Sequence, residues 1–123
     1  MKTATFDPKG SAILVDVACS PQRDGSYNLI LWEKDTNKVV REWKGNFINT
    51  DDDRYPLPRP NSRNDGRLLE GMVVVAIPPR AGPSTVSVSV TQDGRRLATE
   101  RADVPPNSPG ALVDLFILLK RKV

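Results

Sequence analysis

One long polar stretch, residues 45–67, contains several of the aspartates of this chain. It carries three consecutive aspartates, Asp51, Asp52 and Asp53, in a segment with almost no apolar periodicity. Carboxylate and amide oxygens in loops suit Ca²⁺, which takes about six to eight oxygen ligands in a flexible arrangement. The sequence therefore offers a candidate calcium set, drawn from this stretch and from one earlier loop: Asp24, Asn49, Asp51, Asp53 and Asp65.

Two features of the same stretch weigh against calcium. The order of its acidic residues does not follow the D-x-D-x-D-G pattern of an EF-hand loop, and the stretch holds as many arginines as aspartates. Because these charges balance, the aspartates can pair with the arginines instead of with a metal ion. Calcium-dependent binding of a sugar, a lipid headgroup or a protein is therefore the alternative to binding without a cofactor.

The stretch also contains a segment suited to protein recognition. Residues 55–60 read Tyr-Pro-Leu-Pro-Arg-Pro, which is stiffened by proline and presents an aromatic ring and a cation. A stiff segment loses little conformational entropy on docking. The candidate binding residues are Asp51, Asp52, Asp53, Tyr55 and Arg59. The alternative is that Tyr55 and Leu57 fold back and seal the edge of the fold.

Catalytic chemistry is not predicted. The sequence has no histidine, the most frequent general base, and its single cysteine, Cys19, lies in an apolar alternation typical of a buried strand. None of its serines lies in a nucleophile elbow, and no glycine-rich phosphate-binding motif occurs. We therefore expect a protein that is not an enzyme.

Charge and hydropathy limit the partners and the location. The net charge is +3 with both signs interspersed, so no basic stripe predicts nucleic-acid binding. No apolar run reaches transmembrane length, and the N-terminal residues lack the apolar core of a signal peptide. We expect a cytoplasmic protein with one domain over residues 1–123 that binds a partner protein or associates with itself.

Strongly β-prone segments recur along the chain, separated by Gly, Pro, Asn and Asp. This spacing predicts an all-β, about seven-stranded antiparallel Greek-key or immunoglobulin-like β-sandwich with one long loop, residues 45–67. The expected strands cover residues 12–19, 27–33, 38–44, 68–77, 85–91, 96–101 and 111–120. In 85–91, valines alternate with serines and threonines, which predicts one core face and one solvated face. Gly71 indicates a bulge or a close backbone approach within its strand.

Two points of local structure stay open. Residues 111–120 fit a helix by their flanking Ser108-Pro109 and closing basic residues, but their alternation favours a strand. The turn at residues 35–37 permits two registers, and only one of them places Trp32 and Trp43 on the same face of a sheet.

Two of the expected strands carry more apolar side chains than one core face can use. Residues 29–32 are apolar on both faces, which indicates a central strand covered on both sides or an exposed patch that awaits a partner. A strand over 111–120 leaves Phe116 and Leu118 on the face opposite the core. This surplus indicates a self-association surface.

Strand direction predicts how the loops group. If successive strands alternate in direction, the loops at 21–26, 45–67 and 92–95 meet at one end of the sandwich and bring most loop aspartates together. Loops at one end of a sandwich commonly carry binding residues. We therefore expect a non-catalytic binding module that uses this end.

Overall fold

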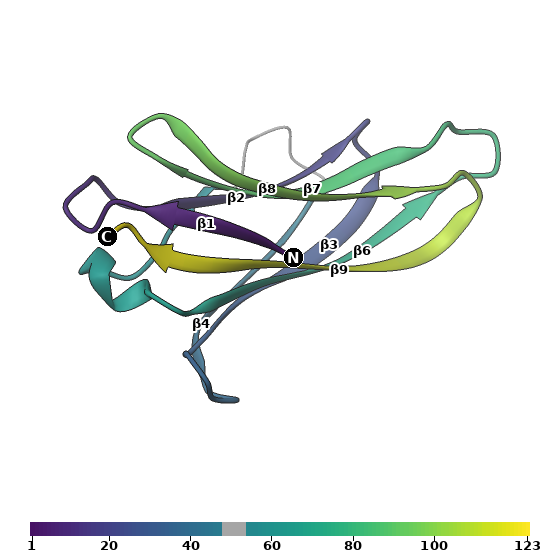
Figure 1. Cartoon of the computed structure of the whole chain (residues 1–123). Coiled ribbons are helices and arrows are strands. Elements are labelled where there is room, and N and C mark those ends of the chain that lie inside the picture. The colour runs from purple at the N-terminus through teal and green to yellow at the C-terminus, as the bar shows by residue number, and fades with distance from the viewer. Residues whose placement is uncertain (48–53) are drawn as a thin grey trace.

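The structure is a sandwich of two β-sheets (Figure 1). It is a computed structural model, and it describes residues 1–47 and 54–123. The described residues form one short 3₁₀ helix, Asn61–Asn64, and these strands: β1 (Lys2–Phe6), β2 (Leu14–Ser20), β3 (Asp24–Trp32), β4 (Val39–Asn46), β5 (Arg54–Pro56), β6 (Leu68–Ile77), β7 (Ser84–Gln92), β8 (Arg95–Val104) and β9 (Ser108–Arg121). One sheet has the order β1-β9-β6-β3-β4 and the other the order β5-β2-β7-β8. The predicted all-β sandwich is confirmed.

The core lies between the sheets, where each strand presents every second side chain. In β7, Val86, Val88 and Val90 point inward and are at most 1% exposed, while serines and threonines alternate with them on the outer side. The alternation predicted for 85–91 is therefore confirmed. Leu69 and Val73 of β6 are fully buried in the same core. Among the described residues no helix is long and apolar enough to span a bilayer.

The two ends of the chain pair with each other. β9 is extended throughout and pairs antiparallel with β6, with Val113 opposite Val73, so the strand predicted for 111–120 is confirmed. β1 lies outside the expected strands, yet it pairs in parallel with β9 and buries Ala4 and Phe6 completely. β1 has only these two inward residues, so its alternation is too short to predict a strand from the sequence.

The stretch 45–67 is a crossing between the sheets and not one loop. Its described part contains β5, in which Tyr55 pairs with Val15 of β2, and the 3₁₀ helix. β4 and β6 both run antiparallel to β3, so the chain leaves β4 at one end of the sandwich and enters β6 at the other. The segment between them must therefore travel the length of the molecule.

This crossing shifts the direction of every later strand, so the predicted grouping of the loops is wrong. Ser84 Oγ donates to the Pro21 carbonyl oxygen at 2.9 Å, which places the turn before β3 beside the proline-rich connection of β6 and β7. The turn after β7 lies at the opposite end, where the Asp93 N–H donates to Ser11 Oγ at 3.3 Å. The loops that were expected to meet are divided between the two ends.

Gly71 marks a close approach between the sheets. It pairs with Leu29 of β3 and Leu115 of β9 without a register shift, so it forms no bulge. A Cβ atom at this position would lie 2.6 Å from Val88 Cγ2 across the core. Of the two interpretations of Gly71, the close approach is confirmed.

The β3–β4 hairpin has the register centred on Thr36, with Leu29 opposite Trp43. A register shift beside Trp32 places that residue opposite Val39. Trp43 packs against the core, whereas Trp32 points to the outer side of the five-stranded sheet. The two tryptophans therefore lie on opposite faces.

Candidate functional site

Apolar side chains occupy much of the outer side of the five-stranded sheet, with polar and charged side chains between them. Cross-strand pairing arranges its outward side chains in rows across β9, β6, β3 and β4. We call this surface the outer apolar face, and it consists of Ile30, Trp32, Val39, Leu68, Met72, Val74, Leu112, Phe116 and Leu118. Leu112 is 65% exposed and Val74 is 42% exposed, so no described segment of the chain covers that part of the face. Uncovered apolar patches are typical of interaction sites.

The outer side of the four-stranded sheet shows that this property is not general to the fold. There, Ser89 and Thr99 join their hydroxyls at 2.9 Å, and Thr85 Oγ1 donates to Asp103 Oδ1 at 2.8 Å. Such polar cross-strand pairs stabilise a solvated sheet surface. The same chain thus makes one outer surface polar and the other apolar.

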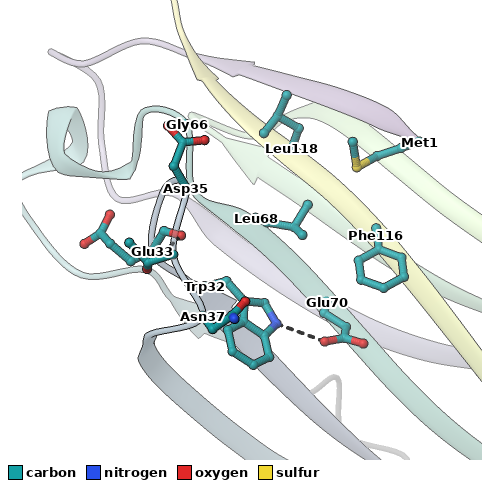
Figure 2. A pocket seen from close by; sticks show the side chains of 11 residues that line it. Met1, Trp32, Glu33, Asp35, Asn37, Gly66, Leu68, Glu70, Phe116 and Leu118 are labelled. Carbon is teal, nitrogen blue, oxygen red and sulfur yellow. Dashed lines mark hydrogen bonds between the residues drawn. The ribbon is translucent and has the colours of Figure 1, made fainter.

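A hollow of about 700 Å³ opens in the outer apolar face (Figure 2). Its apolar lining comes from Trp32 of β3, Leu68 of β6, and Phe116 and Leu118 of β9, with Met1 at one side. The turn between β3 and β4 forms its polar rim. A concave and mostly apolar surface with a few polar groups is the usual form of a binding site.

Glu70 is the buried ionisable group of this hollow, whereas Glu33 and Asp35 lie at its rim. Glu70 is the third residue of β6 and is only 9% exposed. Trp32 Nε1 donates a hydrogen bond to Glu70 Oε1 at 2.9 Å, so the indole and the carboxylate hold each other in place (Figure 2). A buried carboxylate costs free energy unless it is paired, and this one is paired with a neutral donor.

Asp114 is a second carboxyl group next to Glu70. The β6–β9 register sets Phe116 opposite Glu70 and Asp114 opposite Met72, so the two acids are diagonal neighbours on the same face. Desolvation, a hydrogen bond shared with Glu70 and the charge of Glu70 raise the pKa of Asp114 to about 6. The rest of Asp114 is exposed, so solvent screens part of this effect.

Asp114 is expected to make the protein less stable as the pH rises. Its pKa in the folded protein, about 6, lies above the ordinary value of 3.8, so the folded state binds the proton more tightly than the unfolded chain does. The stability from this group is complete below the ordinary pKa and is lost as the pH rises through 6. After screening, Asp114→Asn should raise the free energy of unfolding near pH 8 by about 1 kcal/mol relative to the wild type.

Urea unfolding near pH 5 and near pH 8 measures this effect. The matched control is Glu42→Gln, a carboxylate on the same side of the sheet that already pairs with Lys44 at 3.6 Å. An Asp114→Asn protein that is less stable than the wild type near pH 8 would contradict the prediction.

Arg67 fixes the rim of the hollow. Its Nε and Nη2 donate to the two carboxylate oxygens of Glu33 at 3.2 and 3.0 Å, and its Nη1 donates to Asn64 Oδ1 at 3.1 Å. The hydrogen bond from Arg67, with the Lys34 N–H next in importance, lowers the pKa of Glu33. Arg67 is only 8% exposed, so its charge is used within the fold and is not presented to a ligand.

Tyr55, predicted as a binding residue, faces the interior. Its ring stacks on Trp43 with centroids 5.6 Å apart, and its hydroxyl lies 2.6 Å from the hydroxyl of Tyr27. Leu57 is 2% exposed. These contacts agree with the alternative that Tyr55 and Leu57 seal the edge of the sandwich, and the binding role of Tyr55 stays a prediction. Arg59 is exposed; Asp51, Asp52 and Asp53 lie outside the described residues.

Asp24 and Asp65, the two predicted calcium ligands that the structure describes, lie at opposite ends of the sandwich. Asp24 begins β3 opposite Ala76, at the end of the sandwich where β6 ends, whereas Asp65 Oδ1 accepts from the Arg121 N–H at 2.8 Å at the other end. The described part of the chain contains no group of three or more acidic, cysteine or histidine side chains placed to hold a metal. Asn49, Asp51 and Asp53 lie outside the described residues.

The sequence contains a signal that marks Glu70 and Asp114 as candidate functional residues. Each is the one acidic residue within a strand rich in apolar side chains. Because the inward residues of both strands have odd numbers, the even-numbered Glu70 and Asp114 fall on the outer face. A charge at such a position is costly and therefore calls for an explanation. Only the sheet order shows that β6 and β9 are neighbours and that the two acids therefore lie close together.

Comparison with known proteins identifies no relative from which a function could be transferred. The described geometry is therefore the basis for assigning one. No match was found among protein-family models, curated proteins or solved structures.

Proposed function

We propose that this protein is a non-catalytic binding module that docks a segment of another protein on its outer apolar face. The observation that supports this is the contrast between the two outer surfaces, one polar and one apolar, in a single small sandwich. Exposing large apolar side chains has a free-energy cost of about 25 cal/mol per Å², which a bound partner would remove. The loop-end surface expected from the sequence is replaced by the face of a sheet.

The shape of the face favours a protruding segment as its occupant. The hollow between Trp32 and Phe116 can receive a side chain, and a second, smaller hollow beside Val74 and Leu112 can hold a neighbouring residue. Anchoring side chains that enter pockets carry most of the binding free energy at such interfaces.

A second copy of the chain is a poorer occupant. A two-fold symmetric dimer brings the same patch of both copies together. Glu70 and Asp114 lie near the middle of the face, so a symmetric contact would set carboxylates against carboxylates. Opposed like charges at a desolvated interface cost several kcal/mol.

Selection of a library of random short peptides on the purified protein tests the proposal. The test variant is Leu68→Thr/Phe116→Thr, which keeps β-propensity while removing apolar area, and the matched control is Ser87→Ala on the polar outer surface. Enriched peptides should bind the test variant about tenfold more weakly than the wild type, a loss of about 1.4 kcal/mol, and bind the control normally.

Two results would count against the proposal. Peptides that bind the folded test variant as tightly as the wild type would place the contact elsewhere. Sedimentation that shows a dimer of the wild type, with the test variant a monomer, would assign the face to self-association.

A further inference from the structure

The acidic pair lacks a cation within the fold. Glu70 and Asp114 form no ion pair with any described basic group, the amino group of Met1 included. Two basic residues near the face are engaged elsewhere: Arg67 binds Glu33, and Lys44 binds Glu42. Glu70 is only 9% exposed, and buried carboxylates in proteins are normally paired, so its lack of a cation beside an open hollow indicates that the counter-charge comes from outside.

The walls beside the pair suit an organic cation. The Trp32 ring is fixed by its hydrogen bond to Glu70, and Phe116 is the neighbour of Glu70 across the β6–β9 pairing. Aromatic faces attract ammonium and guanidinium groups, and aliphatic stems pack on apolar side chains such as Leu68 and Leu118.

A hard metal ion does not fit the same place. Ca²⁺ takes about six to eight oxygen ligands, whereas Glu70 and Asp114 bring two carboxyl groups together and the residues opposite them, Phe116 and Met72, are apolar. The described residues contain no third acidic group close enough to complete a metal site.

The geometry points to a site for the ammonium or guanidinium end of a lysine or arginine side chain of the docked segment, with Glu70 and Asp114 as its counter-charges and Trp32 as its wall. This inference rests on the proposed function and specifies which side chain enters the hollow. Because only a protonated amine or a guanidinium matches both the charge and the aromatic wall, the preference is for a basic residue flanked by apolar ones.

Binding in this site should weaken in acid. Asp114 faces Glu70 on β6; β1, on the other side of β9, brings Met1 and Thr3 alongside Phe116 and Leu118. Glu33 and Asp35 lie at the rim of the hollow, and the farther charges on this side of the sheet are Glu42 and Lys44 of β4 and Lys120 of β9. Protonation of the pair removes the charge that attracts the cation, so affinity should fall as the pH drops below about 6.

The test uses n-butylammonium and n-butylguanidinium as probes, with neutral n-butanol as the matched control. The chain has two tryptophans, so nitrogen-edited NMR gives two indole N–H signals, and Trp32→Phe identifies that of Trp32. The cations should shift the Trp32 signal saturably near pH 7.5 and bind about tenfold more weakly near pH 5, because the protonated pair attracts them less. Glu70→Gln should abolish the response, and Glu42→Gln should leave it unchanged.

Equal shifts with n-butanol, or an unchanged response in Glu70→Gln, would overturn the site. The peptides enriched in the selection provide a second arm: replacing their basic residue by norleucine should weaken binding to the wild type about tenfold but not to Glu70→Gln. Peptides that need Phe116 but tolerate norleucine would overturn this inference and leave the proposed function standing. Bound butylammonium without any selected peptide would overturn the partner segment as the source of the cation, and with it the proposed function.

Discussion

Gln92→Ala is expected to lower the free energy of unfolding by about 3 kcal/mol, since it removes three hydrogen bonds and strands a backbone N–H. Gln92 ends β7 and is 4% exposed. Its Oε1 accepts from the Asp7 N–H at 2.8 Å, and its Nε2 donates to the carbonyl oxygens of Asp7 and Ser11 at 2.8 and 3.0 Å. One side chain thus attaches the connection between β1 and β2 to the end of β7 in the four-stranded sheet.

The loss falls mainly on the Asp7 N–H, because the two carbonyl oxygens bound by Gln92 keep other donors. After truncation the Ser11 carbonyl keeps its bond from Asn61 Nδ2 at 2.9 Å, and the Asp7 carbonyl keeps that from the Gly10 N–H at 3.2 Å. The Asp7 N–H loses its partner. Each unsatisfied buried group costs about 1–3 kcal/mol, and the loosened connection also leads directly into β1.

Urea unfolding of Gln92→Ala measures the effect, with Thr91→Ala as the control in the neighbouring position. Thr91 points to the polar outer side, so its truncation should change stability by less than about 0.5 kcal/mol. A Gln92→Ala protein within about 1 kcal/mol of the wild type would show that water replaces the glutamine amide without loss.

The sequence predicted the sandwich because alternation is a local signal. The alternation of Val86, Val88 and Val90 predicts an inward face without any knowledge of the neighbouring strands. The same holds for the odd-numbered residues of β9. The arrangement of the loops depends on counting strands, and β5 has only three residues. Missing so short a strand reversed the predicted position of every later loop.

The sequence predicted the apolar side chains of the outer face but not their arrangement, because alternation within a strand is local and strand order is not. Residues 29–32 and Phe116 and Leu118 revealed a surplus of apolar side chains, which the sequence alone assigns to some uncovered surface. That these side chains form one face, with Glu70 and Asp114 between them, depends on β6 pairing with both β3 and β9. Strand order is a non-local property, and no pattern within a strand encodes it.

Tyr55→Ala is expected to lower the free energy of unfolding by about 3 kcal/mol, the lower end of the range for truncating a large aromatic side chain that is packed in a core. Tyr55 closes the open side of the sandwich, because it joins β5 of one sheet to Trp43 of β4 in the other. Tyr55→Phe keeps the stacking and loses only the hydrogen bond to the Tyr27 hydroxyl, so it should cost about 1 kcal/mol.

The same pair of variants separates sealing from recognition, the two roles open to this tyrosine. If Tyr55 seals the edge, Tyr55→Ala reduces stability while the selected peptides still bind the folded fraction, because the outer apolar face lies on the other side of the β3–β4 hairpin. Arg59→Ala is the control, since an exposed side chain of the same segment should change stability by less than about 0.5 kcal/mol. A stable Tyr55→Ala protein that no longer binds the peptides would instead make the tyrosine part of the contact surface. The opposite outcome would leave Tyr55 with a structural role, in which it holds the edge strands β5 and β4 of the two sheets together.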